Sequence, residues 1–284
     1  MPTRPDVYIA RVLRKCDALK KAGFWDREVR ISPRGWLNNF PDNEQPLAAR
    51  LLDKFQFFSE DMVNRMLTTA ARHVGADLTA KRTFIAGVEG ENPNPTDSGY
   101  MFCRKARQLL KVAEERCLTI DNCAQNLEPG DTLIFVDDFV GTGQQMSATW
   151  SRLSGSLKTA GTDPLRIDVR YLGLVATETG VSRIRSTMNI PCHFAHILGP
   201  EYHIKEILRG ESNAINEVFD EATIIHFLES HAQNLITKSY IDKVWGFNNL
   251  GLALAFSHSV PDGSLPIYWA DSSTQGWTPL VSRT

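Results

Sequence analysis

The sequence has 284 residues, 42% of them hydrophobic and 23% charged, which is ordinary for a globular protein with a full core. The net charge of −2 excludes a global basic field of the kind that attracts nucleic acid, although it leaves room for a local basic patch. No apolar run approaches 18 residues, and the five cysteines form no Cys-x-x-Cys pair, so we expect a reduced, cytoplasmic protein without a membrane span.

The first 80 residues are predicted to be helical. Apolar residues at helical spacing between positions 9 and 19 indicate one amphipathic helix. Asp42 and Gln45 have the spacing of a capping box, which predicts that a second helix begins at Asp42. Ser59, followed by two acidic residues, is expected to begin a third helix.

Beyond residue 80 the pattern changes to alternating strands and helices. The predicted strands cover residues 83–88, 133–136, 167–176 and 192–198. The predicted helices between them cover residues 101–115 and 144–160. Strands that alternate with helices indicate a parallel sheet with right-handed crossovers. We therefore expect an α/β fold in this part of the chain.

The last third of the sequence is expected to extend this core. Residues 218–227 have a helical pattern, residues 250–256 read as a strand, and the segment 261–269 is rich in turn and aromatic residues. We interpret the chain as an α/β core at 81–200 with a helical N-terminal decoration at 1–80 and a mixed C-terminal extension at 201–284. On this interpretation the chain does not form two independent domains.

The most informative segment runs from Asp131 to Gln145. An apolar strand leads to Asp137 and Asp138, which we expect where the strand ends, and a small-residue loop follows before a helix that begins at Gln144. Ligands of open α/β sheets lie at the carboxyl ends of strands. Carboxylates accept hydrogen bonds from sugar hydroxyls and bind Mg²⁺, whereas amides at a helix start bind phosphate. The segment therefore predicts a site for a phosphorylated sugar.

This combination resembles the ribose-5-phosphate loop of the type I phosphoribosyltransferases. Asp137 and Asp138 match the acidic pair of that family. The loop is matched by Gly141, Thr142, Gly143, Gln144 and Gln145, of which Gln145 departs from the usual hydroxyl residue. The resemblance implies a parallel sheet flanked by helices, a 5-phosphate on the loop, and ribose and Mg²⁺ on the acidic pair. Response-regulator and Rossmann-like folds also place acidic residues after a buried strand, but neither a Walker loop nor a Gly-x-Gly-x-x-Gly segment is present.

The same resemblance implies a second loop, for pyrophosphate, after the strand at 84–88. Thr96, Asp97, Ser98 and Gly99 would offer donors to phosphate oxygens there, and Arg104 would add positive charge. The alternative is that these are solvated residues at the start of a helix.

A narrower resemblance covers most of the chain. The segment 35–40, the central signature and the ending at 261–280 are similar to phosphoribosyltransferase-like proteins of prokaryotic defence gene clusters, some beside ATPases or the reverse transcriptases of retrons. This resemblance implies protein partners of those kinds, with nucleic acid reached only through a partner. For Trp36 and Trp269 in these end motifs we favour packing over ligand contact.

Two functions remain open at this stage. One is an enzyme that transfers ribose 5-phosphate from phosphoribosyl pyrophosphate to a base, or cleaves the same bond in a nucleotide. The other is an inactive module that senses a nucleotide or docks a partner. The segment Glu178–Gly180 is either a wall of the base site or a simple turn, and His193 with His196 has the wrong spacing for zinc on a strand.

Overall fold

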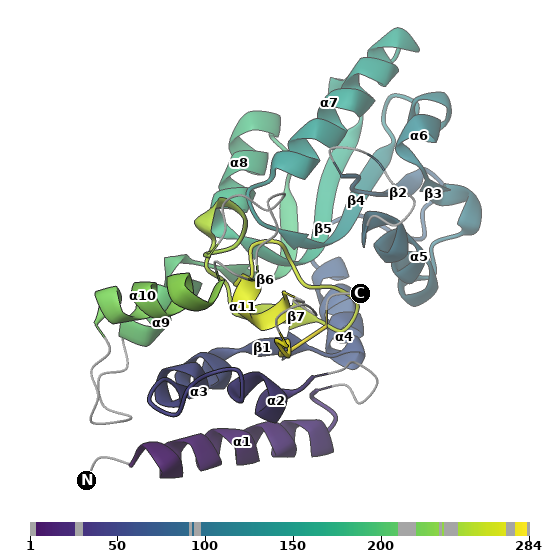
Figure 1. Cartoon of the computed structure of the whole chain (residues 1–284). Coiled ribbons are helices and arrows are strands. Elements are labelled where there is room, and N and C mark those ends of the chain that lie inside the picture. Colours follow the sequence, from purple (N-terminus) through teal and green to yellow (C-terminus); the bar gives the residue numbers. More distant parts are fainter. Residues whose placement is uncertain are drawn as a thin grey trace. The chain divides into compact units, whose positions relative to one another are not determined.

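The computed structural model describes residues 4–25, 31–90, 93, 98–209, 220–232, 235, 244–270 and 276–282. The chain forms two compact units, one of residues 1–62 with 199–284 and one of residues 63–198 (Figure 1). These units do not follow the three predicted segments, because both ends of the chain contribute to one hydrophobic core. None of the helices in the described ranges is long and apolar enough to cross a bilayer.

The unit of residues 63–198 is built on a five-stranded sheet in which every neighbouring pair is parallel, in the order β3-β2-β4-β5-β6. The strands are β2 (Thr83–Gly87), β3 (Cys117–Leu118), β4 (Thr132–Val140), β5 (Asp168–Thr177) and β6 (Cys192–Leu198). The helices are α4 (Glu60–Ala71), which begins in the other unit, α5 (Ser98–Leu110), α6 (Ile120–Asn126), α7 (Gln144–Thr159) and α8 (Glu178–Met188). The predicted fold class, a parallel α/β sheet flanked by helices, is confirmed.

The core of this unit follows from side-chain alternation along the strands. Phe84, Leu133 and Phe135 point to the face covered by α6, α7 and α8, whereas α5 packs against β2 and β4. Single-turn 3₁₀ segments precede β3 and β5, at Glu114–Arg116 and Pro164–Arg166. The sequence analysis missed β3, α6 and α8. It also placed α5 too late along the chain, since the helix ends at Leu110 and is followed by Lys111, which has a positive φ of 56°.

The other unit is mostly helical. Its helices are α1 (Pro5–Lys21), α2 (Pro33–Leu37), α3 (Gln45–Lys54), α9 (Ile204–Arg209), α10 (Glu221–Ala232) and α11 (Pro266–Trp269), with 3₁₀ segments at Pro200–Tyr202 and Phe247–Asn249. Its strands are β1 (Gln56–Phe58) and β7 (Leu254–Phe256), which pair in parallel. The predicted strand at 250–256 is therefore limited to its last three residues. Of the predicted helical segment 218–227, residues 218 and 219 lie outside the described ranges.

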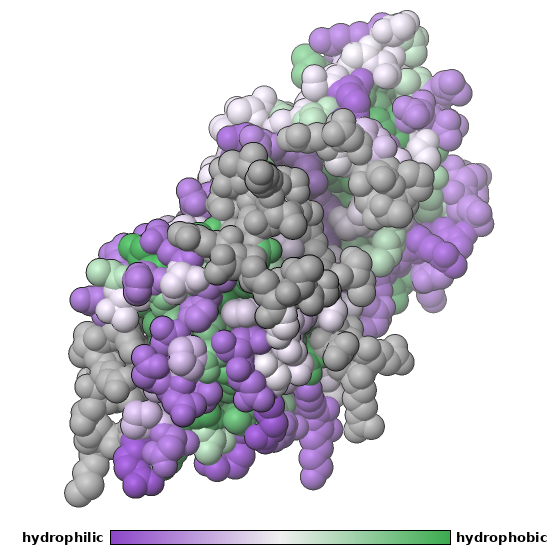
Figure 2. Space-filling view, in the orientation of Figure 1, coloured by the Kyte–Doolittle hydropathy of each residue, from purple (hydrophilic) through white to green (hydrophobic). Residues whose placement is uncertain are grey.

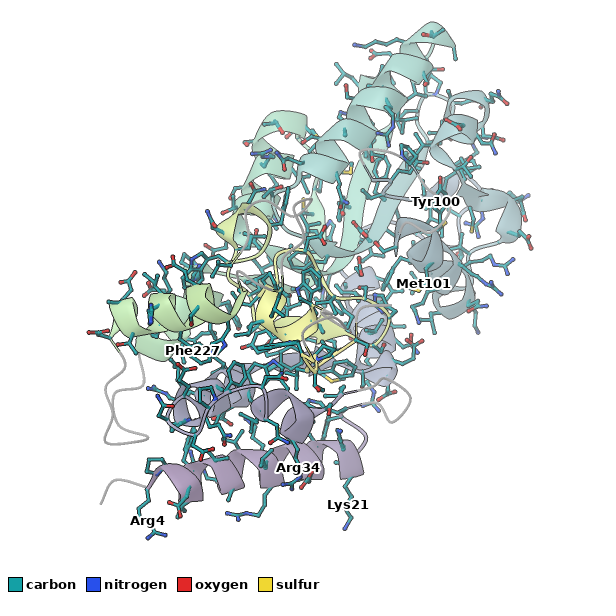
Figure 3. The ribbon with its side chains drawn as sticks, in the orientation of Figure 1. Arg4, Lys21, Arg34, Tyr100, Met101 and Phe227 are labelled. Atoms are coloured by element: carbon teal, nitrogen blue, oxygen red, sulfur yellow. The ribbon has the colours of Figure 1, made fainter. Side chains whose placement is uncertain are left out.

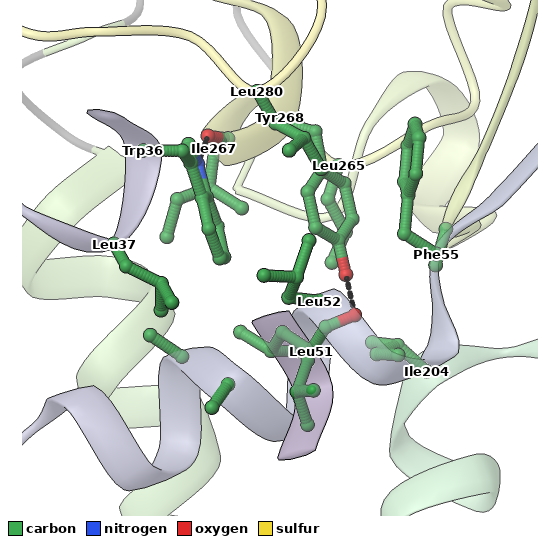
Figure 4. Close-up of a cluster of buried hydrophobic side chains, with 14 of the residues drawn as sticks. Trp36, Leu37, Leu51, Leu52, Phe55, Ile204, Leu265, Ile267, Tyr268 and Leu280 are labelled. Carbon is green, nitrogen blue, oxygen red and sulfur yellow. Dashed lines mark hydrogen bonds between the residues drawn. The ribbon is translucent and has the colours of Figure 1, made fainter. Parts of the chain in front are cut away.

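Two predictions about this unit have clear outcomes. The capping box at Asp42 is wrong, because Pro41 O accepts hydrogen bonds from the amides of Glu44 and Gln45, which holds residues 42–44 in a turn before α3. The packing role of Trp36 is confirmed. Its ring is fully buried and stacks on Tyr268 with centroids 5.5 Å apart, and its Nε1 donates to Ile267 O at 2.7 Å. Figure 4 shows this cluster and the hydrogen bond from Tyr268 to Leu51 O, 3.0 Å long.

Candidate functional site

The acidic pair lies within a strand, not after it. β4 continues through Asp137 and Asp138 to Val140, so the prediction that the strand ends before the pair is wrong. β4 continues because its two neighbouring strands differ in length at this end of the sheet. β2 pairs with β4 only as far as Val136, whereas β5 remains paired with β4 up to Val140. The pair therefore sits where β4 has lost its neighbour on one side only.

Asp137 is held by donors from three elements. The residue is buried, at 3% exposure. Oδ1 accepts from Ser98 Oγ at the start of α5 (3.2 Å) and from the Asp138 amide (2.9 Å), and Oδ2 accepts from the Tyr171 hydroxyl of β5 (3.1 Å). The structure thus brings the predicted residues Ser98, Asp137 and Asp138 together and adds Tyr171, which the sequence analysis missed.

Burial governs the protonation of this cluster. Desolvation, followed by the charge of Asp138 and a hydrogen bond with its side chain, raises the pKa of Asp137 well above the ordinary value. Desolvation and the charge of Asp137 raise the pKa of Tyr171 in turn. The buried carboxyl of Asp137 therefore holds its proton more tightly than an exposed carboxyl would, and a bound cation would favour its release.

One side of the loop after β4 packs against the start of α8. Thr177 Oγ1 donates to Gly141 O at 2.5 Å and accepts from the Gly180 amide at 3.0 Å. Gly143 has a φ of +75°, and a Cβ there would lie 3.1 Å from Gly180 O. The segment 178–180 is thus neither a turn nor an open wall but the first turn of α8, capped by Thr177.

Several backbone amides of this loop have no hydrogen-bond acceptor among the described residues. Within the described part of the chain, no acceptor is bonded to the backbone amides of Gly141, Thr142, Gly143 and Gln145. Thr142 Oγ1 donates to the side chain of Gln144 at 3.1 Å, and α7 begins at Gln144, as predicted. Amides at the start of a 16-residue helix form a site of positive potential. The loop is therefore suited to an anion such as phosphate.

The remaining predicted residues lie around the exit of β2. Gly99 is a packing residue, because a Cβ on it would lie 2.0 Å from Val88 O. Arg104 is exposed and, at about 100° per residue, is turned about 120° around α5 from Ser98, so the structure does not bring it to the acidic pair. Thr96 and Asp97 lie outside the described residues.

The sequence analysis also missed a partly buried ion pair directly after the end of β2. Glu89, 6% exposed, accepts from Arg152 Nη2 of α7 (3.0 Å) and from the Tyr100 hydroxyl of α5 (2.9 Å). Thr149 Oγ1 of α7 donates to Glu89 O at 3.0 Å. The only available signal was a polar residue directly after an apolar strand. Its partners are remote in the sequence and carry no motif.

Two carboxylates are a small donor set for a metal ion. No group of three or more histidine, cysteine, aspartate or glutamate side chains within reach of a common ion occurs among the described residues. Mg²⁺ commonly takes one or two protein carboxylates and completes its shell with water and substrate phosphates. The pair Asp137–Asp138 fits that pattern, because both are carboxylates at the edge where β2 has ended.

Comparison with known proteins identifies the family. The family PRTase-CE matches residues 33–283, so the chain belongs to it. A search of curated proteins found no match. Solved structures with some likeness include orotate phosphoribosyltransferase from Aeropyrum pernix (16% identity, 49% of this chain and 72% of that one, TM-score 0.32) and adenine phosphoribosyltransferase from Rhodothermus marinus (15%, 66% and 99%, 0.31). A hypothetical protein from Neisseria gonorrhoeae with bound ppGpp is similar at the same level (15%, 51% and 85%, 0.33). Likenesses at these scores carry no further argument.

Proposed function

We propose that this member of the PRTase-CE family binds a 5-phosphoribosyl compound, either phosphoribosyl pyrophosphate or a nucleoside 5′-monophosphate, together with Mg²⁺. One observation carries the proposal. A buried pair of carboxylates near the end of β4 is followed, three to eight residues later, by backbone amides that bond no acceptor in the described part of the chain. Sugar hydroxyls need acceptors and phosphate needs donors, and this connection supplies both.

Each part of the ligand has its own partner in this arrangement. The 5-phosphate is held by the amides of residues 141–143 and 145 at the start of α7. The ribose hydroxyls donate to Asp138 and Asp137, of which Asp137 is fixed by Tyr171 and Ser98. The same two carboxylates would hold Mg²⁺, which would supply the positive charge that allows acidic side chains to lie beside an anionic ligand.

The chemistry that suits this site is substitution at the anomeric carbon of ribose. Positive charge that develops on the sugar is stabilised by two fixed carboxylates nearby. The base nitrogen or water forms the new bond to the anomeric carbon as the bond to pyrophosphate or to the base breaks. The protein needs no nucleophilic side chain for this reaction. On the resemblance of the end motifs, we further propose that the protein acts in antiviral defence with an ATPase or reverse-transcriptase partner.

A second candidate function is ligand sensing without catalysis. Gln145 stands where the resemblance implies a hydroxyl, and Glu89 places a buried negative charge near the exit of β2. The first feature removes one donor to the 5-phosphate, and the second leaves Arg152, the cation paired with Glu89, unavailable to a second phosphate group. A module of this kind would bind a nucleoside monophosphate and pass the signal to a protein partner.

The test combines ligand-induced stabilisation with turnover. Wild-type protein is expected to melt several degrees higher with 1–5 mM adenosine or guanosine monophosphate, or with phosphoribosyl pyrophosphate and Mg²⁺, because the ligand binds the native state. The double variant Asp137→Asn, Asp138→Asn should lose this shift while keeping its circular dichroism spectrum. Asp121→Asn, an exposed carboxylate on α6, is the matched control and should keep the shift.

Turnover then separates the two candidates. Pyrophosphate release that depends on an added base, or release of a base from a nucleotide, identifies the enzyme. A melting shift without either reaction identifies the sensor. An equal shift in the double variant, or no shift of the wild type with any of these ligands, would reject the proposal.

A further inference from the structure

The helix α1 carries a local excess of positive charge. Residues 4–21 contain six lysines and arginines but only two aspartates, a net charge of +4 in a chain whose total is −2. The rest of the chain is therefore acidic overall. The composition alone conceals this asymmetry, which matters only if the basic residues share a surface.

They do share one. At about 100° per residue, Arg4, Arg11, Arg14, Lys15 and Lys21 all fall within an arc of about 120° around α1. We call this arc the α1 cationic sector. Both aspartates of the helix, Asp6 and Asp17, lie outside it on one border. All five basic residues are exposed (Figure 3 shows Arg4 and Lys21 extending outward from the two ends of the helix).

The other face of α1 is buried in the protein core. Tyr8, Val12 and Cys16 are at most 2% exposed and belong to the core that α1 forms with α3. The cationic sector is therefore the free side of an anchored helix. Figure 2 shows hydrophilic side chains at both ends of α1, and Val7 is the one large apolar residue exposed within the sector.

Ion pairs among the described residues neutralise little of this charge. Arg4 meets Asp6 at 3.0 Å, but both side chains are mostly exposed, so this pair is weak. Lys15 is paired with Asp53 at 2.7 Å. Arg11, Arg14 and Lys21 form no ion pair with any described residue. Asp17, the nearest acid to them on the helix, is instead paired with Arg34 of α2 at 2.9 Å.

We propose that the α1 cationic sector is a docking surface for the phosphate backbone of a nucleic acid. From Arg4 to Lys21 it extends about 26 Å at 1.5 Å per residue, a length that faces about seven phosphates of one duplex strand. Three of its five cations are arginines, whose planar forks match phosphate oxygens. Contacts of this kind position a backbone and do not read sequence.

The same features argue against two other anionic partners. A helix that binds a membrane inserts an apolar face, and the apolar face of α1 is already buried against α3. An acidic protein partner would need a central apolar or aromatic anchor, and Val7 alone within the sector is a poor one. Repetition of cations along one helix, without such an anchor, fits a repeating phosphate chain best.

The test uses the full chain and fluorescently labelled 20-nucleotide DNA, single-stranded and duplex, in anisotropy titrations from 50 to 200 mM salt. Wild-type protein is expected to bind with a strong salt dependence. The variant Arg11→Gln, Arg14→Gln, Lys21→Gln should bind at least about tenfold more weakly at 50 mM salt. Its slope of log affinity against log salt should be about 2–3 smaller, because each lost contact removes about 0.7–0.9. Glutamine has a helix propensity close to that of arginine and lysine, so α1 should persist.

The matched control is Lys81→Gln, Lys158→Gln, Arg166→Gln, which removes the same charge from exposed positions in the other unit. It should retain most of the affinity. Equal losses in both triple variants would show a non-specific charge effect and overturn the proposal. Binding to phosphatidylserine vesicles or polyglutamate without binding to either DNA would also overturn it. If the triple variant melts at a lower temperature, the reversal Arg14→Glu alone, with Lys158→Glu as its control, decides the same question.

Discussion

The connections that follow the neighbouring strands β2 and β4 differ in whether their polar groups already have partners within the protein. The β4–α7 loop presents amides without acceptors and has Gly143 at positive φ. The exit of β2 is closed upon itself, because Glu89 is paired with Arg152 and Tyr100, and Gly87 and Gly99 touch backbone to backbone. The first connection is prepared for an anion from outside, whereas the second satisfies its polar groups internally.

The contrast indicates how a ligand would be oriented. A phosphate at the β4–α7 loop meets donors, whereas a second phosphate at the β2 exit meets the carboxylate of Glu89, whose nearby cation Arg152 is already paired with it. One end of the site therefore binds an anion directly, and the other requires a metal ion or a neutral group. The predictions below test each side of this contrast, beginning with the largest expected effect.

Gly87→Ala should be the most damaging single change. A Cβ at this position would lie 2.4 Å from the backbone of Gly99, and neither chain can move without disturbing the sheet. We expect a loss of about 3 kcal/mol in the free energy of unfolding, measured by urea denaturation. Gly155→Ala on α7, where a Cβ meets nothing within 4 Å, is the control and should stabilise by about 0.5–1 kcal/mol. A mild effect of Gly87→Ala would mean that the β2 exit is not tightly closed.

The ion pair at the β2 exit should couple this exit to α7. We expect Glu89→Gln and Arg152→Gln each to lower the free energy of unfolding by about 1–2 kcal/mol, since the partner of each loses a charged hydrogen bond. The double variant should cost less than the sum of the two, because the second substitution has no pair left to break. Strict additivity in this double-mutant cycle would show that the pair contributes nothing.

Much of the β4–α7 connection was predictable, and little of the β2 exit was. Residues 131–145 carry their information locally, as an apolar run, an acidic pair, small residues and a helix start. The prediction that the strand ends before the acidic pair fails because the length of β5, which stays paired with β4 up to Val140, cannot be read from the sequence of β4. Glu89 and Arg152 are 63 residues apart in the sequence, so no local pattern predicts their contact. Likewise β1 and β7 pair across the chain, and three residues each are too few to recognise.

The protonation of Asp137 allows the acidic pair beside the β4–α7 loop to be tested by the pH dependence of stability. Its folded pKa is raised while the unfolded carboxyl titrates near 3.8, so the folded state holds the proton more tightly. The stabilisation is complete below the unfolded pKa and is lost as the pH rises through the folded pKa. In metal-free buffer, Asp137→Asn should therefore flatten the fall of stability with rising pH, as measured by urea unfolding at several pH values above 4. An unchanged slope in the variant would show that Asp137 ionises normally.

Gln145→Thr should have the smallest effect and the opposite sign. The side chain of Gln145 is exposed and forms no hydrogen bond with a described residue, so its replacement should not alter stability by more than about 0.5 kcal/mol. A hydroxyl at this position would add one donor to the loop. We expect the affinity for a nucleoside monophosphate to rise about two- to fivefold by calorimetry. A weaker affinity would mean that the glutamine side chain itself contacts the ligand.

The central claim is that the loop of residues 141–145 binds a phosphate. Amide NMR spectra of ¹⁵N-labelled protein during titration with adenosine monophosphate and Mg²⁺ test this claim most directly. The account predicts that the amides of Gly141, Thr142 and Gly143 shift in proportion to saturation, whereas that of Gly155, further along α7, does not. Saturable shifts confined to other segments, with these three amides unmoved, would contradict it.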